Sequence, residues 1–142
     1  MREILFRGIM KYENSRYKRG QWVIGDLVRL QDGNDGKPHI YGYGEVFPDT
    51  VGQYTGYKID DIKVFENDIA KVHLEIPYLP HQDKAIDDIG VVCFDTEDLR
   101  YYVVSNTGEK YALCYIKEIV GNIHDNPDYC KEGFVVLGIK NL

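Results

Sequence analysis

Histidines, cysteines and short acidic runs are the side chains of this sequence that could hold a metal ion or take part in catalysis. The four histidines, at positions 39, 73, 81 and 124, are widely separated, and none has a Cys or His partner at the spacing of a structural zinc site. The best local candidate is His81 with Asp83, Asp87 and Asp88, which would supply hard oxygen ligands beside an imidazole. An acidic stretch of this kind is more commonly a solvated loop, so we expect no metal site and no cofactor.

The cysteines do not indicate disulfides or nucleophilic catalysis. Cys93, Cys114 and Cys130 are odd in number and widely spaced, which argues against a disulfide framework. Cys93 and Cys114 have apolar neighbours, whereas a reactive thiol needs an electropositive, partly exposed setting. We therefore expect buried free thiols in a reducing compartment, the cytoplasm.

Other catalytic signatures are missing from the sequence. No serine stands in a G-x-S-x-G setting, and no dinucleotide, Walker or EF-hand pattern occurs. The sequence therefore predicts no catalytic residues. An enzyme of unknown type stays open as an alternative.

One dense basic cluster lies beside aromatic residues. Arg16, Lys18 and Arg19 precede Trp22, and such a combination could stack bases and contact phosphates of single-stranded nucleic acid. The net charge of -6 opposes electrostatic attraction to DNA or RNA. Nucleic-acid binding is therefore an alternative hypothesis rather than the leading one.

The many aromatic residues favour binding to protein. Tyr41, Tyr43, Tyr54 and Tyr57 are candidates for a surface that binds another protein or a second copy of the chain, because aromatic β surfaces with edge strands suit strand addition and self-association. We expect a homo-oligomer, with a phage or host protein as a further candidate partner. No run of about 20 apolar residues is present, so we expect no membrane segment.

Composition and turn residues indicate the fold class. The 142 residues suit a single domain, and the 12 Tyr, 5 Phe and 14 Gly suit short strands joined by tight turns. We therefore expect an all-β, mainly antiparallel fold with few or short helices. Residues 1–49 would form a layer of a strand and hairpins, with a hairpin turn at 32–36, and residues 50–142 a curled SH3-like barrel with a C-terminal extension.

The stretch from Thr50 to Leu74 organises this prediction. Gly52 and Gly56 favour a turn region, since glycine tolerates positive φ, and Asp68 marks a tight entry into a core strand at 69–74. Residues 75–88 contain two prolines and several charges, which predicts a long excursion rather than a strand pair. Further strands are expected at 89–94, 100–105, 111–114 and 117–123, and the apolar tail at 133–139 is expected to pair.

Four segments resemble the YopX family of bacteriophage and prophage proteins. They are M-R-E-I-L-F-R at the N-terminus, T-V-G-Q-Y-T-G at 50–56, V-F-E-N-D-I-A-K-V at 64–72 and E-I-V-G-N-I-H-D-N-P at 118–127. Asn67 stands where the family usually has glycine, and residues after Tyr129 extend beyond its customary end. The resemblance implies a nearly all-β fold of complex topology and a phage or prophage origin in a bacterial cytoplasm. It supplies no catalytic residues, and the biochemical role of the family is not established.

Overall fold

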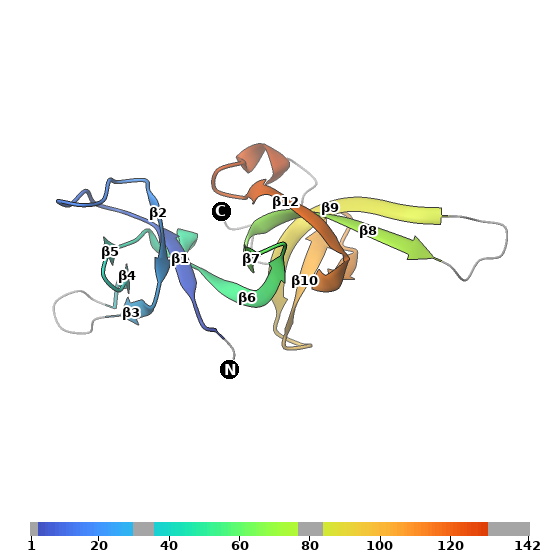
Figure 1. Cartoon of the computed structure of the whole chain (residues 1–142), viewed down its shortest axis with the longest axis horizontal. Helices are drawn as coiled ribbons and strands as arrows, with labels where there is room; N and C mark the ends of the chain where they lie inside the picture. The colour runs from blue at the N-terminus through green and yellow to red at the C-terminus, as the bar shows by residue number, and fades with distance from the viewer. Residues whose placement is uncertain (1–2, 30–35, 77–83, 131–142) are drawn as a thin grey trace. The chain divides into compact units, whose positions relative to one another are not determined.

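The computed structural model describes residues 3–29, 36–76 and 84–130, and these form antiparallel sheets without an α-helix (Figure 1). The all-β prediction is confirmed. The chain divides into two compact units, Met1–Gly56 (the N-terminal unit) and Tyr57–Leu142 (the C-terminal unit). The expected boundary between residues 49 and 50 precedes β6. The boundary between the two units instead falls within β6, between Gly56 and Tyr57. The elements are β1 (Phe6–Ile9), β2 (Trp22–Gly25), β3 (Leu27–Arg29), β4 (Pro38–Ile40), β5 (Gly44–Glu45), η1 (Pro48–Thr50), β6 (Gly52–Ile59), β7 (Ile62–Phe65), β8 (Asp68–Ile76), β9 (Lys84–Asp95), β10 (Arg100–Ser105), β11 (Lys110–Ala112), η2 (Leu113–Tyr115), β12 (Ile116–Asn122) and η3 (Pro127–Cys130).

Two small sheets share the core of the N-terminal unit. β1 pairs with β2, with Ile9 opposite Trp22, and also with the start of β6. β3, β4 and β5 form a second sheet, so the expected pairing around the 32–36 turn is confirmed, although turn residues 32–35 lie outside the described part. The core residues are Met10, Val23, Ile40 and Val46, all buried. They come from β2, β4 and positions flanking β1 and β5.

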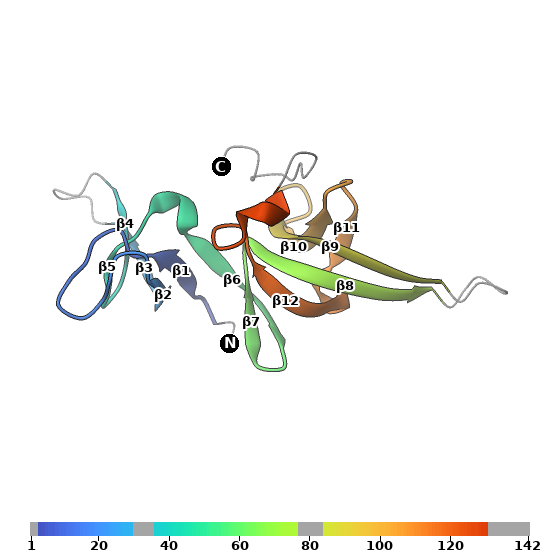
Figure 2. The same ribbon diagram turned by 90° about the horizontal axis from the view of Figure 1, so that it is seen from above.

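The glycine-bearing stretch is a strand rather than the predicted turn. Both Gly52 and Gly56 lie in β6, and Gly56 has φ +89° inside that strand. The turn comes afterwards, at Asp60 and Asp61, whose φ values of 47° and 67° are those of a type I′ hairpin. Figure 2 shows the resulting β6–β7 hairpin. More buried and less buried side chains alternate along parts of β6, as expected for a strand. The two glycines obscured that pattern in the sequence.

The predicted entry into the core strand is confirmed. Asn67 has φ +71°, and the buried carboxylate of Asp68 accepts a hydrogen bond from the Phe65 backbone N–H at 2.8 Å. This bond closes the two-residue connection between β7 and β8. β8 then places Ile69 and Val72 on opposite faces of its sheet, both buried.

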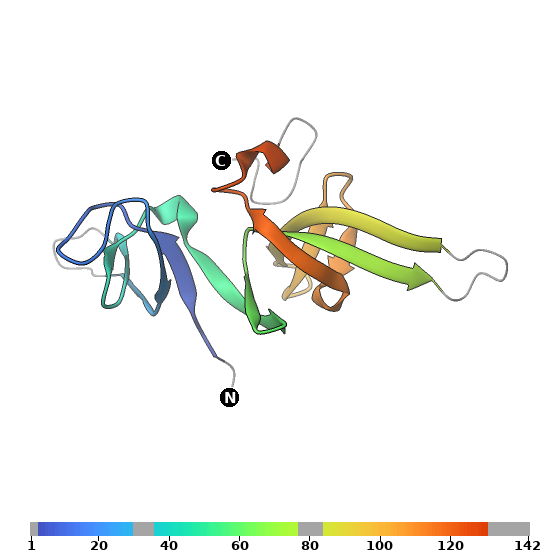
Figure 3. The ribbon, with the colours of Figure 1, turned by 45° about the horizontal axis from the view of Figure 1, so that its top comes forward.

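The predicted excursion at 75–88 is wrong at both of its ends, because residues 75–76 belong to β8 and residues 84–88 to β9, and these two strands pair. β8 and β9 pair in register from Ile69 opposite Val91 to Ile76 opposite Lys84. They run side by side along this length in Figure 3. The two prolines that suggested a break, at 77 and 80, lie between the described strand ends. Prolines in a segment therefore do not exclude a strand pair in the residues on either side of them.

Five strands in the order β11-β10-β9-β8-β12 form the sheet of the C-terminal unit, which curls into half a barrel. Its inner core contains Val64, Ala70, Val72, Val92, Val103 and Ile116. A second cluster, Ile69, Val91, Val104 and Ile123, packs on the other side of the same strands. The strands expected at 89–94, 100–105 and 117–123 correspond to β9, β10 and β12, whereas the one expected at 111–114 is a strand only as far as Ala112 and continues into η2. Closure as an SH3-like barrel stays a prediction.

Two further expectations concern the C-terminal tail and a membrane-spanning segment. The C-terminal tail at 133–139 lies outside it. Across residues 3–29, 36–76 and 84–130, we find no helix with the length and apolar character needed to cross a bilayer.

Candidate functional site

The four predicted surface tyrosines occupy different environments. Tyr41 is 74% exposed, next to β4, whereas Tyr43 is half-buried with its ring centroid 4.6 Å from that of Tyr17. Tyr54 is only 3% exposed, because alternation along β6 turns it into the interior, and its assignment to a surface is wrong. Tyr57 is half-buried against the inner core of the C-terminal unit. The predicted four-tyrosine surface therefore does not form.

The basic cluster and Trp22 belong to one hairpin. Arg16, Lys18 and Arg19 are exposed in the loop between β1 and β2, and Trp22 is the first residue of β2. Asn14 holds this loop by accepting hydrogen bonds from the backbone N–H groups of Arg16 and Tyr17. Arg19 lies over the Phe47 ring, with its guanidinium carbon 5.7 Å from the ring centroid.

An unpredicted cation lies at Trp22. The Arg7 guanidinium carbon is 4.9 Å from the Trp22 ring centroid, and Arg7 is opposite Ile24 in the β1–β2 register. Ile24 is 46% exposed on β2, which is an edge strand of its sheet. Arg7, Trp22 and Ile24 are therefore neighbours on β1 and β2, and we call these three side chains the Trp22 face. It combines an aromatic ring, an arginine and an exposed aliphatic group.

The cysteines differ from one another. Cys93 is half-buried, and burial raises the pKa of its thiol to about 12, so it is an unreactive core thiol. Cys114 is exposed, which corrects the prediction of burial. It lies in η2 rather than in a strand, and the 3-10 turn directs it outward. The side chain of Cys130 is not among those that the structure describes.

The described residues contain no group of three or more His, Cys, Asp or Glu side chains arranged to hold a metal. His81 and Asp83 of the predicted candidate lie outside them. Asp87 instead meets His73, whose Nδ1 is 2.7 Å from Asp87 Oδ1, and this hydrogen bond raises the pKa of His73. Asp88 faces elsewhere and accepts a hydrogen bond from the Tyr111 hydroxyl at 2.7 Å.

The turn between β9 and β10 is held by a buried carboxylate. Asp95 accepts hydrogen bonds from the backbone N–H groups of Glu97 at 2.8 Å and Asp98 at 3.1 Å, and it is paired with the Lys110 ammonium. The Lys110 bond, followed by the two backbone bonds, lowers the pKa of Asp95 to about 2. The carboxylate is therefore ionised at neutral pH and fixes the turn.

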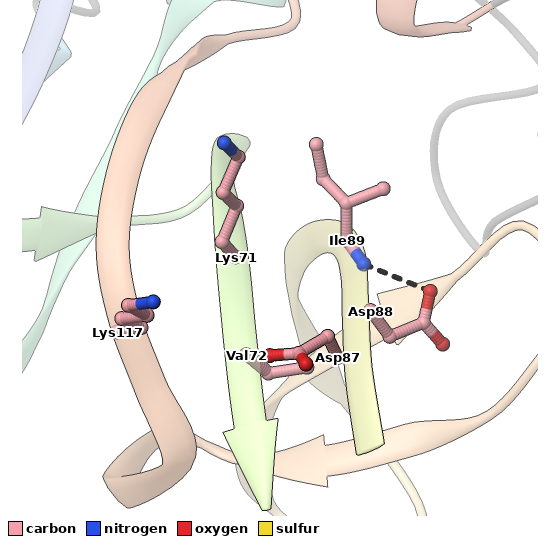
Figure 4. Close-up of a pocket in the computed structure, with 6 residues that line it drawn as sticks. All are labelled: Lys71, Val72, Asp87, Asp88, Ile89 and Lys117. Atoms are coloured by element: carbon pink, nitrogen blue, oxygen red, sulfur yellow. Dashed lines mark hydrogen bonds between the residues drawn. The ribbon is translucent and has the colours of Figure 1, made fainter. Parts of the chain in front are cut away.

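A hollow of about 550 Å³ lies on the five-stranded sheet (Figure 4). It is lined by Lys71 and Val72 of β8, by Asp87, Asp88 and Ile89 of β9, and by Lys117 of β12. The β8–β12 register shifts between Ile116 and Glu118, so Lys117 is the extra residue of a β-bulge. Bulges commonly redirect a side chain. Sequence reasoning missed this site because it needs the pairing of β8 with β9, which was predicted as an excursion, and with the distant strand β12.

Comparison with known proteins identifies no relative, since no family model, curated protein or solved structure matches the chain.

Proposed function

We propose that this chain is a non-enzymatic β module of phage or prophage origin that binds protein, itself included, in the cytoplasm of a bacterial host. The origin is supported by the four segments that resemble the YopX family. The binding function is supported by the composition of the Trp22 face, in which Ile24 is exposed and Arg7 and Trp22 are half-buried.

The Trp22 face has the character of a protein-binding surface. Tryptophan and arginine are enriched among the residues that contribute most to protein interfaces. Here the Arg7 guanidinium carbon lies 4.9 Å from the Trp22 ring centroid, so the two side chains are in cation–π contact. Ile24 extends this surface as an exposed β-branched residue on an edge strand. Edge strands can accept a further strand from a partner.

Light scattering over a concentration series tests self-association. At about 100 μM the chain should exceed the monomer mass, because an interface of ordinary size binds more tightly than that. Ile24→Asp should lower the mass, since it places a charge in the contact. Ile62→Asp is the matched control, because Ile62 is an isoleucine that is 58% exposed on another strand at a sheet edge, β7. Equal masses for both variants would exclude the Trp22 face as the self-association surface.

A second candidate function, binding of single-stranded nucleic acid, is favoured by the distribution of charge. The N-terminal unit has eight Lys and Arg against seven Asp and Glu, a net charge of +1, whereas the C-terminal unit has nine against sixteen, a net charge of -7. The acidity that opposes phosphate binding therefore belongs to the unit without the basic hairpin. The Trp22 ring could stack on a base while Arg16, Lys18 and Arg19 contact phosphates.

Fluorescence anisotropy with a labelled oligothymidine tests this candidate. Binding should weaken steeply between about 50 and 200 mM salt and should be lost in the triple variant Arg16→Glu, Lys18→Glu, Arg19→Glu. A Lys58→Glu, Lys63→Glu, Lys117→Glu variant changes the net charge equally in the other unit and should bind as before. Equal losses in the two variants would indicate a non-specific charge effect.

A further inference from the structure

Leu99 combines two unfavourable features at the tip of the β9–β10 turn. Its φ is +57°, a left-handed conformation that glycine adopts readily and a bulky side chain does not. Its side chain is also 73% exposed, so it gains little from burial. A leucine here is favoured neither by the backbone nor by the core. Observed backbone strain of this kind is often associated with a function.

The turn presents Leu99 in a fixed place. Its backbone N–H donates to the Asp95 carbonyl at 2.8 Å, and the Asp95 carboxylate caps the two preceding residues. Glu97 and Asp98 are exposed next to Leu99, and the Asp98 carboxylate also accepts the Tyr102 hydroxyl at 2.8 Å. The tip is therefore a rigid apolar group preceded by two carboxylates and followed by the exposed Arg100.

The hollow between β8, β9 and β12 is lined by side chains of both charges. Both of its carboxylates already have partners. Asp87 lies against His73, and Asp88 accepts the Tyr111 hydroxyl and the Ile89 backbone N–H. The Lys71 and Lys117 ammonium groups are exposed and form no ion pair within the described part of the chain. Figure 4 shows Ile89 beside Lys71, opposite it in register. The hollow therefore places two lysine ammonium groups beside an aliphatic side chain, together with two carboxylates that are engaged by other hydrogen-bond donors.

We propose that the β9–β10 turn of one copy inserts Leu99 into this hollow on a second copy, where Lys71 and Lys117 meet Glu97 and Asp98. Leu99 would contact Ile89, and its acidic neighbours would meet the two exposed ammonium groups. The hollow volume, about 550 Å³, is within the range of about 300 to 1,000 Å³ that is typical of ligand pockets. This inference rests on the proposed protein-binding function and names a second surface, besides the Trp22 face, through which two copies would associate.

The contact joins two different surfaces, so it is heterologous. Such contacts form rings when the rotation between copies closes and open chains when it does not. Each copy also has one turn and one hollow, and both stay available at the ends of an open chain. The average mass should therefore keep rising with concentration unless a ring closes.

Removal of Leu99 tests the apolar part. In sedimentation velocity at about 100 μM, Leu99→Gly should weaken self-association at least about tenfold in Kd, the effect of losing one well-buried leucine from a contact. This substitution suits the backbone conformation, so a loss of association cannot be attributed to a strained fold. Ile62→Thr removes apolar surface from another exposed position and should associate as the unaltered chain does. A Leu99→Gly chain that associates normally would overturn the proposal, as would a monomeric parent chain.

Charge exchange tests the polar part. Lys71→Glu with Lys117→Glu gives an acidic hollow opposite an acidic turn, and Glu97→Lys with Asp98→Lys gives a basic turn opposite a basic hollow. Each double variant should be monomeric alone, and an equimolar mixture should associate because each hollow then meets a turn of opposite charge. A mixture that stays monomeric would refute the contact.

The experiments distinguish the Trp22 face from the turn-to-hollow contact as the surface of self-association. If Ile24→Asp dissociates the oligomer and Leu99→Gly does not, the Trp22 face is the self-association surface and the turn-to-hollow contact is wrong. The reverse result supports the turn-to-hollow contact and removes the Trp22 face from self-association.

Discussion

Replacing Leu99 by alanine and by glycine should reverse the usual order of stability of these two residues. In an ordinary strand, glycine is less stable than alanine by about 0.5 to 1 kcal/mol, because it loses more backbone freedom on folding. Leu99 has φ +57°, where a residue with a Cβ costs about 1 to 2 kcal/mol relative to right-handed backbone. Alanine keeps that cost and glycine removes it. Glycine at position 99 should therefore be more stable than alanine by roughly 0.5 to 1 kcal/mol.

The exposed side chain keeps this comparison simple. Leu99 is 73% exposed, so both substitutions lose the same small burial, which is below about 1 kcal/mol when full burial is worth about 1.5 to 3. Neither substitution leaves a buried cavity, so no cavity cost contributes to the change in stability. The difference between the two variants therefore reports the backbone alone.

Amide hydrogen exchange at Val92 and Val103 is the suitable measurement, because both are buried strand residues of the C-terminal unit. Trp22 fluorescence would report the N-terminal unit. Ala112→Gly is the matched control, since Ala112 is exposed in β11 and is not among the residues with positive φ, and it should lower stability by about 0.5 to 1 kcal/mol. A Leu99→Gly chain less stable than Leu99→Ala would refute the strain argument.

Three further predictions concern backbone conformation and a buried charge. Gly56→Val should destabilise the fold by about 1 to 3 kcal/mol, because Gly56 has φ +89°, and an unchanged thermal midpoint would show that β6 tolerates the change. Gly90→Ala should cost about 1 to 3 kcal/mol or more in urea unfolding, since a Cβ there would lie 2.5 Å from the Val104 carbonyl oxygen, and a neutral result would mean that β9 and β10 can separate freely. The depressed pKa of Asp95, about 2 against an ordinary 3.8, predicts stability that is fully present above pH 3.8 and lost as the pH falls toward 2. Asp95→Asn removes the charge that pairs with Lys110, so stability should be lower near pH 7 and should fall less between pH 4 and 2, and acid titration by circular dichroism measures both slopes.

Local patterns account for the elements that were predicted correctly. Alternating apolar residues define β8, and short polar turns separate β9, β10 and β11. The buried Asp68 was recognisable because an Asp after Asn67 suits a tight connection. Such features depend on neighbours within a few residues, so one sequence is sufficient to find them.

Errors arose where local signals conflicted with pairing between distant residues. The charges and prolines of 75–88 suggested a loop, yet His73 opposite Asp87 is a favourable cross-strand pair on an exposed face. The glycines of β6 suggested a turn, and that interpretation left Tyr54 on the surface. Once β6 is a strand that pairs with β1, alternation places Tyr54 in the interior.

The hollow could not be predicted from sequence because none of its parts is unusual alone. Lys71 and Lys117 resemble any exposed lysines, and the bulge that separates Lys117 from the regular β8–β12 register leaves no clear signal in the sequence. Leu99 likewise gave no signal that the sequence analysis used. Its meaning required the φ value, which distinguishes a strained exposed leucine from an ordinary one.

The charge distribution constrains how two C-terminal units can meet. Each has a net charge of -7, so two of them repel at long range, whereas Lys71 and Lys117 would attract Glu97 and Asp98 only at close range. The Debye length is about 30 Å at 0.01 M salt and about 8 Å at 0.15 M, so salt removes the long-range repulsion first. The close contact would weaken only at higher salt, because partly buried pairs are screened less. The turn-to-hollow contact should therefore be strongest at intermediate salt, whereas an apolar contact through Ile24 has no such maximum of its own.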